Sequence, residues 1–370
     1  MGFKKNVLIC LPHFQNNHIS YYWNLLEEYF ETDEVSVLAY TFHEDSKEKL
    51  GKFNSYFPNK KETTAWFLLK NIRLFRKADI IIYEELYKVS LSSVFLVALF
   101  GKKTFLTVHN VHKWLKREKP RSLKERITSG IINFIIFKIR GIITVSLSLK
   151  NYILQEKLFH KDVYYVPFTK VSVQKREKIT KGATLNFTIP GTINNDRRDY
   201  KLVLEALWEL LSKDTYPITL YLLGKVVKLS NEEKALIQKI NTQKPNTIIY
   251  WETFISESVF DEILQKTHYL IGNIKLQYTE NRIPEIYGKS KETGVLFLML
   301  AHQIPTLFPE GFQTDAIYKD LILYYPDNKS GFAKKIQSVC QKENTTVLNF
   351  NFEQHKAIVE HEKQHLRNNL

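Results

Sequence analysis

Short apolar runs alternate with longer amphipathic stretches along most of the chain. Uninterrupted apolar runs are typical of parallel strands buried on both faces, whereas apolar residues repeated every three or four positions indicate helices. In the first half, strand-like runs lie near Asn6–Leu11, Val35–Ala39, Ile80–Tyr83, Lys103–Val108, Gly141–Val145 and Val163–Val166. In the second half, they lie near Leu185–Ile189, Ile218–Leu223, Thr247–Trp251, Tyr269–Gly272, Pro305–Phe308 and Leu321–Tyr324.

Helical periodicity fills the intervals, near His18–Phe30, Glu62–Lys77, Leu91–Phe100, Ser122–Ile139 and Leu147–Leu158, with a last helix near Phe352–Arg367. This alternation predicts an α/β fold with parallel sheets. A chain of 370 residues is too long for one hydrophobic core, and the polar, basic stretch after Val166 reads as a linker. We therefore predict doubly wound, Rossmann-like domains over residues 1–170 and 171–350. The C-terminal helix, 351–370, can cross back to the first domain.

The turn after the predicted strand Leu185–Ile189 carries two arginines. Pro190 and Gly191 end the strand, and Arg197 and Arg198 come just before the next apolar helical repeat. Free N–H groups at a helix N-terminus and the helix dipole favour an anion, above all a phosphate. The pattern predicts a phosphate site at the carboxyl edge of the second sheet, and the plain alternative is a solvated loop.

Several other phosphate and metal motifs are missing from the sequence. No Gly-rich dinucleotide turn follows the first strand, and there is no Gly-x-x-x-x-Gly-Lys-Ser/Thr loop and no Asp-x-Asp pair. The two cysteines, Cys10 and Cys340, have no metal-ligand spacing and suit a reducing cytoplasm. We therefore expect no metal and no cofactor, and a diphosphate site built from arginines and backbone N–H groups.

Three segments, Thr107–Lys113, Pro190–Leu207 and Tyr287–Leu307, carry a resemblance to a known group of enzymes. The first has a Thr-Val-His-Asn turn after a strand, the second is the arginine turn, and the third joins a Gly-containing loop to an apolar helix. They resemble the GT-B fold glycosyltransferases, especially the retaining enzymes of family 4. The resemblance implies two Rossmann-like domains facing each other across a cleft, with a nucleotide-diphosphate sugar as the donor.

The resemblance also implies site residues. The catalytic pair is His109 and Glu285, and the donor-binding set is Gly191, Thr192, Arg197, Arg198, Glu292, Thr293 and Gly294. Acceptor contacts are expected after the first strand, from His13, Asn16, Asn17 and His18, which could instead cap the next helix. Two positions depart from the family pattern: Thr192 replaces a basic residue, and Leu298 stands where a ribose-binding glutamate belongs. Glu285 and Glu292 are the nearest replacements, and the sequence leaves the choice open.

The chain has a formal net charge of +14, most of it within residues 1–170. Cations are dense between Lys113 and Arg126, which predicts contact with an anionic membrane surface through Trp114, Lys116, Arg117, Lys119 and Arg121. The alternative is a solvated charged face, and no nucleic-acid-binding motif accompanies the patch. No apolar run is long enough to span a bilayer or to form a signal peptide, so we expect a cytoplasmic protein at the inner face of the membrane.

Together these features predict a metal-independent, hexosyl-type glycosyltransferase. It would transfer a sugar with retention to a lipid-linked or oligosaccharide acceptor in cell-surface polysaccharide assembly. Two alternatives remain open. One is a nucleotide-sugar 2-epimerase of the same fold, and the other is a catalytically silent module that binds sugar nucleotides.

Overall fold

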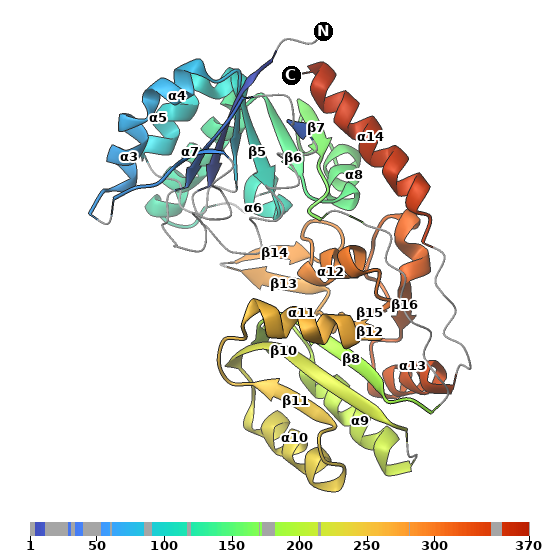
Figure 1. Ribbon diagram of the computed structural model, residues 1–370. Coiled ribbons are helices and arrows are strands. Elements are labelled where there is room, and N and C mark those ends of the chain that lie inside the picture. The colour runs from blue at the N-terminus through green and yellow to red at the C-terminus, as the bar shows by residue number, and fades with distance from the viewer. Residues whose placement is uncertain are drawn as a thin grey trace.

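The chain forms two α/β domains, each built on a parallel sheet, with the hairpin β13–β14 between them (Figure 1). The computed structural model describes residues 4–11, 29–30, 34–39, 53–59, 61–84, 91–116, 120–169, 171, 182–213, 216–280, 282–341 and 350–369. The predicted fold class is confirmed.

The N-terminal sheet has seven strands in the order β3-β2-β1-β4-β5-β6-β7. They are β1 (Asn6–Leu11), β2 (Glu34–Ala39), β3 (Asn54–Tyr56), β4 (Ile80–Tyr83), β5 (Thr104–Val108), β6 (Gly141–Thr144) and β7 (Asp162–Tyr165). Strands β4, β5 and β6 are buried along their whole length, which explains their uninterrupted apolar sequences. The helices are α3 (Thr64–Lys70), α4 (Ile72–Lys77), α5 (Leu91–Phe100), α6 (Val111–Leu115), α7 (Leu123–Lys138) and α8 (Leu147–Gln155).

The C-terminal sheet also has seven strands, in the order β11-β10-β8-β12-β15-β16 with β9 paired to β10. They are β8 (Leu185–Pro190), β9 (Ile193–Asn194), β10 (Ile218–Lys228), β11 (Ile248–Trp251), β12 (Tyr269–Ile271), β15 (Thr306–Pro309) and β16 (Ile322–Tyr325). The helices are α9 (Tyr200–Lys213), α10 (Asn231–Gln243), α11 (Glu257–Lys266), α12 (Gly294–His302) and α13 (Lys329–Gln341). The strand order reverses beside β8, and doubly wound sheets bind ligands outside such a reversal.

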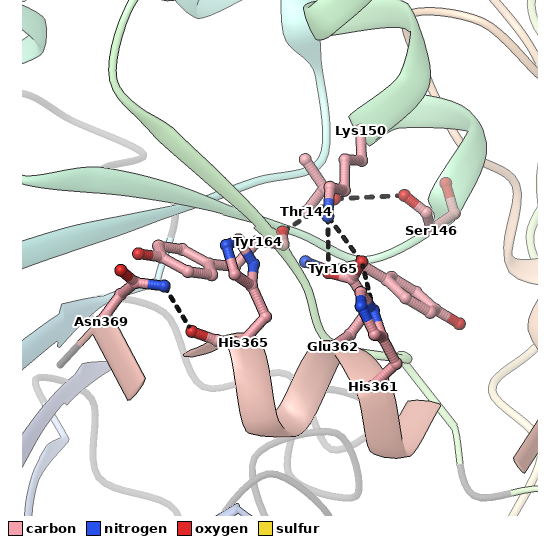
Figure 2. A network of polar contacts seen from close by, with 9 residues as sticks. All are labelled: Thr144, Ser146, Lys150, Tyr164, Tyr165, His361, Glu362, His365 and Asn369. Atoms are coloured by element: carbon pink, nitrogen blue, oxygen red, sulfur yellow. Dashed lines mark hydrogen bonds and ion pairs between the residues drawn. The ribbon is translucent and has the colours of Figure 1, made fainter. Parts of the chain in front are cut away.

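The last helix, α14 (Phe352–Asn369), leaves the C-terminal domain and runs beside β7 and α8 of the N-terminal domain (Figure 1). Lys150 Nζ of α8 lies 2.6 Å from Glu362 Oε2, which also accepts the Tyr165 N–H at 3.3 Å (Figure 2). Leu366 is buried in the N-terminal core. The helix therefore completes the domain that it does not follow in sequence.

Every predicted strand is present, and β10 continues five residues beyond its expected end, from Leu223 to Lys228. The helix expected over Glu62–Lys77 is two helices, because Asn71 ends α3 and precedes α4. The helix expected near His18–Phe30 lies largely outside the described residues. The antiparallel hairpin of β13 (Gln277–Glu280) and β14 (Ile283–Ile286) was not expected, and it matters most for the site.

Candidate functional site

In the turn after β8, the backbone of Gly191 packs closely against the Arg198 side chain and against Gly224 of β10. Gly191 has φ 92°, and a Cβ there would lie 3.2 Å from Nη2 of Arg198. A Cβ on Gly224, at the neighbouring strand, would lie 2.2 Å from the Gly191 carbonyl oxygen. Glycine is therefore required at Gly224 for β8 and β10 to pack this closely, and at Gly191 for the positive φ that turns the chain toward Arg198.

The two arginines of this turn have different surroundings. Arg197 donates from Nε and Nη2 to the Tyr287 hydroxyl, at 3.1 and 2.9 Å, and its guanidinium lies over the Tyr278 ring. The backbone of Arg198 forms an isolated antiparallel β-bridge with Ile274, which lies beyond the end of β12. Its Nη1 is buried and makes no hydrogen bond within the described part of the chain. The Arg198 guanidinium interacts with the Tyr200 hydroxyl, and its Nη1 keeps a hydrogen-bonding capacity that no described residue uses.

Asn273 follows β12, on the other side of the strand reversal from Gly191. Its side chain is 1% exposed, and among the described residues neither Nδ2 nor Oδ1 has a hydrogen-bond partner. A buried amide without partners costs free energy, and such groups occur where a ligand completes the hydrogen bonding. The Asn273 carbonyl accepts from Asp199 N at 2.9 Å, which ties it to the arginine turn. Sequence reasoning missed this residue.

A second cation reaches the aromatic pair that Arg197 contacts. Lys291 is buried, and its Nζ lies 5.3 Å from the ring centroid of Tyr278 and 5.9 Å from that of Tyr287. It comes from the loop before α12 rather than from the arginine turn, where Thr192 is exposed. Cation–π contacts hold both cations near one place. Lys291 therefore brings a second positive charge to the aromatic pair that Arg197 contacts.

The turn after β5 joins the N-terminal domain to this loop. The backbone of Asn110 forms an isolated antiparallel β-bridge with Lys291, and Val111 N donates to Ser290 O at 2.7 Å. His109 packs edge-on against Phe168, whose ring stacks on Phe297 of α12 at 4.2 Å. The expected catalytic histidine therefore lies where the two domains meet.

Glu285, the other expected catalytic residue, is buried within the interdomain contact. Its Oε1 accepts from Lys113 N at 3.1 Å, and its Oε2 accepts from Ser290 Oγ at 2.5 Å. His112 Nδ1 lies 3.8 Å from Glu285 Oε2 and 2.6 Å from Pro284 O. Burial raises the pKa of Glu285 above its usual value. The carboxyl group connects the hairpin to α6.

Glu292 faces the start of α8 in the other domain. It is buried, accepts from Ser148 Oγ at 2.9 Å, and its pKa is raised by burial to about 7. Asp315 accepts from Asn151 Nδ2 at 3.3 Å, and burial raises its pKa to about 6. Thr293 caps α12 through its hydroxyl, and Gly294 is the first residue of that helix. Two carboxyl groups with raised pKa values therefore lie near each other beside the loop that precedes α12.

The residues expected to face a membrane differ in exposure. Trp114 is 2% exposed and packs in the N-terminal core, so its assignment to a membrane surface is wrong. Val111 and Trp114 lie one helical turn apart on the buried face of α6, which explains the error. Lys116 and Arg121 are exposed, as expected of surface cations.

Other predicted residues lie outside the described residues. They are Arg117, Lys119, His13, Asn16, Asn17 and His18. Across the described ranges, no cluster of His, Cys, Asp and Glu could hold a metal ion. None of the described helices is long and apolar enough to cross a membrane.

No protein-family model matches the chain, and no curated protein matches its sequence. Solved structures do match it over nearly its whole length. Anabaena HepE in complex with UDP and glucose has a TM-score of 0.58 over 98% of both chains, at 11% identity. Sucrose-phosphate synthase from Thermosynechococcus elongatus has a TM-score of 0.56 over 99% of this chain and 98% of that one, at 12% identity. The chain has the GT-B fold.

A UDP-N-acetylglucosamine 2-epimerase also matches, with a TM-score of 0.51 over 92% of this chain and 88% of that one, at 10% identity. At such identities a match establishes the fold alone. The GT-B fold accounts for the arrangement seen here, in which Gly191, Arg198 and Asn273 gather at one strand reversal and His109 approaches from the other domain. Function has to be argued from these residues.

Proposed function

We propose that this protein is a metal-independent glycosyltransferase of the retaining family 4 type. It transfers a hexosyl-type sugar, with retention, from a nucleotide-diphosphate donor to a lipid-linked glycan during cell-surface polysaccharide assembly. One observation carries the proposal: Nη1 of Arg198 and both polar atoms of the Asn273 amide are buried without a hydrogen bond to any described residue, and they flank the strand reversal of the C-terminal sheet. A neighbour of the same fold holds UDP and glucose.

In this proposal the diphosphate lies against the arginine turn. Arg198 donates to it directly, while Arg197 and Lys291 neutralise its charge from the Tyr278 and Tyr287 pair. Charge-assisted hydrogen bonds of this kind are short and strong, and they strengthen further as charge develops on the leaving group. The N-terminal end of α12, at Gly294, adds the favourable end of a helix dipole without needing a metal ion.

Retaining transfer requires the anomeric C–O bond of the donor to weaken while positive charge develops on the sugar ring. His109 orients the sugar and acceptor from the facing domain. Glu285 positions the turn that carries His109, because its oxygens accept from Lys113 N and Ser290 Oγ. Glu292, with a pKa of about 7, is protonated in part of the molecules at neutral pH and can exchange hydrogen bonds with donor hydroxyls.

The acceptor side is assigned to the N-terminal domain. His13, Asn16, Asn17 and His18 follow β1 in sequence, and we assign them to the acceptor. The net charge of +14 suits an acceptor presented at an anionic membrane, with the enzyme at the cytoplasmic face.

A second candidate is a nucleotide-sugar 2-epimerase, and two observations favour it. A protein of that activity shares the fold. The carboxyl groups of Glu292 and Asp315 have raised pKa values beside the loop that precedes α12. Groups with pKa values near neutrality are suited to moving protons on a sugar.

Calorimetry with UDP and other nucleoside diphosphates tests the donor site. Arg198→Ala should weaken binding at least tenfold, because a charge-assisted bond contributes about 1.5–3 kcal/mol. Lys201→Ala is the matched control, since Lys201 lies three residues after Arg198, in the first turn of α9, and pairs with Glu232. Equal affinity in wild type and Arg198→Ala would refute the phosphate assignment.

Proton NMR with a panel of nucleotide sugars separates the functions. An α-linked donor should release the α-sugar first during slow hydrolysis if the configuration is retained. Appearance of a C2-epimer would favour the epimerase. A membrane lipid extract is added as the source of acceptor. If the protein then binds a nucleotide sugar tightly but turns over no donor, the result favours the catalytically silent module.

A further inference from the structure

Three neighbouring helices of the N-terminal domain expose large apolar side chains. Helix α5 contacts both α3 and α7. Trp66 of α3 is 62% exposed, and Leu123 and Ile127 of α7 are 74% and 56% exposed. The apolar face, as named below, comprises Trp66, Leu69, Phe95, Leu99, Leu123 and Ile127. Phe137, at the other end of α7, is also exposed but has Lys138 and Lys161 at its ring and is not counted in it. Monomeric soluble domains rarely leave this much apolar surface uncovered on adjacent elements.

The apolar face is surrounded by positive charge. Helices α3, α4 and α7 and the short 3-10 helix Gly101–Lys103 carry cations, and Glu125 is their one acidic residue. Glu125 lies 3.4 Å from Arg282, so its charge is partly neutralised. The exposed cations are Lys70, Arg73, Arg76, Lys77, Lys102, Lys124, Arg126 and Lys138, of which Lys70 pairs with Glu62 at 3.6 Å. Apolar side chains bordered by cations match the interface of an anionic bilayer, where rings and aliphatic chains enter the acyl boundary and cations meet headgroups.

The positions of the exposed apolar side chains along α3 and α7 also favour a membrane near the site. Helices that follow parallel strands start at the carboxyl edge of the sheet, where ligands bind. Trp66 and Leu123 lie in the first turns of α3 and α7 and Ile127 in the second turn of α7, whereas Leu69 and Leu99 lie near the opposite ends of their helices. The three most exposed side chains of the apolar face are therefore those nearest the edge from which His109 meets the C-terminal domain.

We infer that the apolar face docks the enzyme on an anionic membrane, so that a lipid-linked acceptor is presented at the carboxyl edge of the N-terminal sheet. The inference rests on the membrane part of the proposed function. It replaces the surface predicted from sequence around Trp114, whose indole is buried.

Vesicle flotation tests this inference with the full-length protein. Wild type should float with phosphatidylcholine vesicles containing 30% phosphatidylglycerol, should not float with pure phosphatidylcholine, and should dissociate as salt rises. The double variant Trp66→Ser/Ile127→Ser should lose at least tenfold in vesicle partitioning, and Lys124→Gln/Arg126→Gln should lose several-fold. Trp66 fluorescence should shift to shorter wavelength on binding, and the shift should vanish in Trp66→Phe.

The matched control is Phe254→Ser, because Phe254 is 80% exposed but belongs to the C-terminal domain. Its vesicle binding should equal that of wild type, and nucleotide affinity should be the same in all variants. Equal flotation of wild type and Trp66→Ser/Ile127→Ser would overturn the inference. The inference would also be overturned if wild type does not bind anionic vesicles but forms dimers that Trp66→Ser/Ile127→Ser dissociates. The apolar face would then be a protein interface. Neither result depends on sugar turnover, so the failure of the proposed function would be seen separately.

Discussion

Removing the Asn273 amide should stabilise the free protein and abolish its stabilisation by donor. Each polar atom of this amide is buried without a partner among the described residues. Burying an unsatisfied polar group costs about 1–3 kcal/mol. Asn273→Ala relieves that cost but loses some packing, so we expect a net gain of about 1 kcal/mol in the free energy of unfolding. For a domain of this size, that corresponds to a rise of about 2–4 °C in Tm.

Asn241 provides the matched control. Its amide donates to Ile248 O and accepts from Ile248 N, both at 2.8 Å. Asn241→Ala removes both hydrogen bonds and should lower stability by about 1–3 kcal/mol, the opposite sign. Differential scanning fluorimetry with and without UDP-sugars measures both effects. A fall in Tm for Asn273→Ala comparable to that for Asn241→Ala would show that the Asn273 amide is satisfied within the protein, and the argument for a ligand there would fail.

Three further predictions follow from single contacts. Lys291→Met keeps the aromatic packing but removes a charge beside Arg197, so calorimetry should show a larger loss of affinity for UDP than for uridine; equal losses would contradict a phosphate role. Burial raises the pKa of Glu292 from 4.5 to about 7, so folding takes up a proton between these values and wild-type stability falls as pH rises through them; Glu292→Gln should remove up to about 3 kcal/mol of that fall in denaturation curves at pH 5 and 8. Lys150→Met leaves the buried Glu362 carboxylate unpaired and should cost about 3–5 kcal/mol, and Lys150→Met/Glu362→Gln should recover part of it.

Most strands of the parallel sheets were predicted from the sequence because they are continuous apolar runs. The short strands β3, Asn-Ser-Tyr, and β9, Ile-Asn, were missed because they have no such run. The strand, turn and helix around Gly191 followed from the same pattern together with Pro190. The hairpin was not predictable in this way, since its first strand reads Gln-Tyr-Thr-Glu and its turn contains Arg282 at φ 68°. A short polar strand that pairs only with its neighbour carries no buried apolar period.

Individual site residues were harder to predict than the elements that hold them. Lys291 looks like any solvated lysine in sequence, and only the fold brings it to Tyr278 and Tyr287. Asn273 looks like an ordinary loop residue after a strand. A signal for Trp114 did exist, because Val111 and Trp114 share one face at helical spacing, but the neighbouring cations outweighed it.

The segment from Pro284 to Lys291 contacts both halves of the site within eight residues. Tyr287 accepts from Arg197 in the arginine turn, while Glu285 and Ser290 hydrogen-bond to Lys113 and Val111 of the N-terminal domain. Interactions that share one short segment couple, since a shift of the backbone moves all of them together. Substitutions at Ser290 should therefore change donor affinity although Ser290 bonds only within the hairpin and to α6. A Ser290→Ala variant with unaltered nucleotide affinity and unaltered stability would show that the two halves of the site are independent.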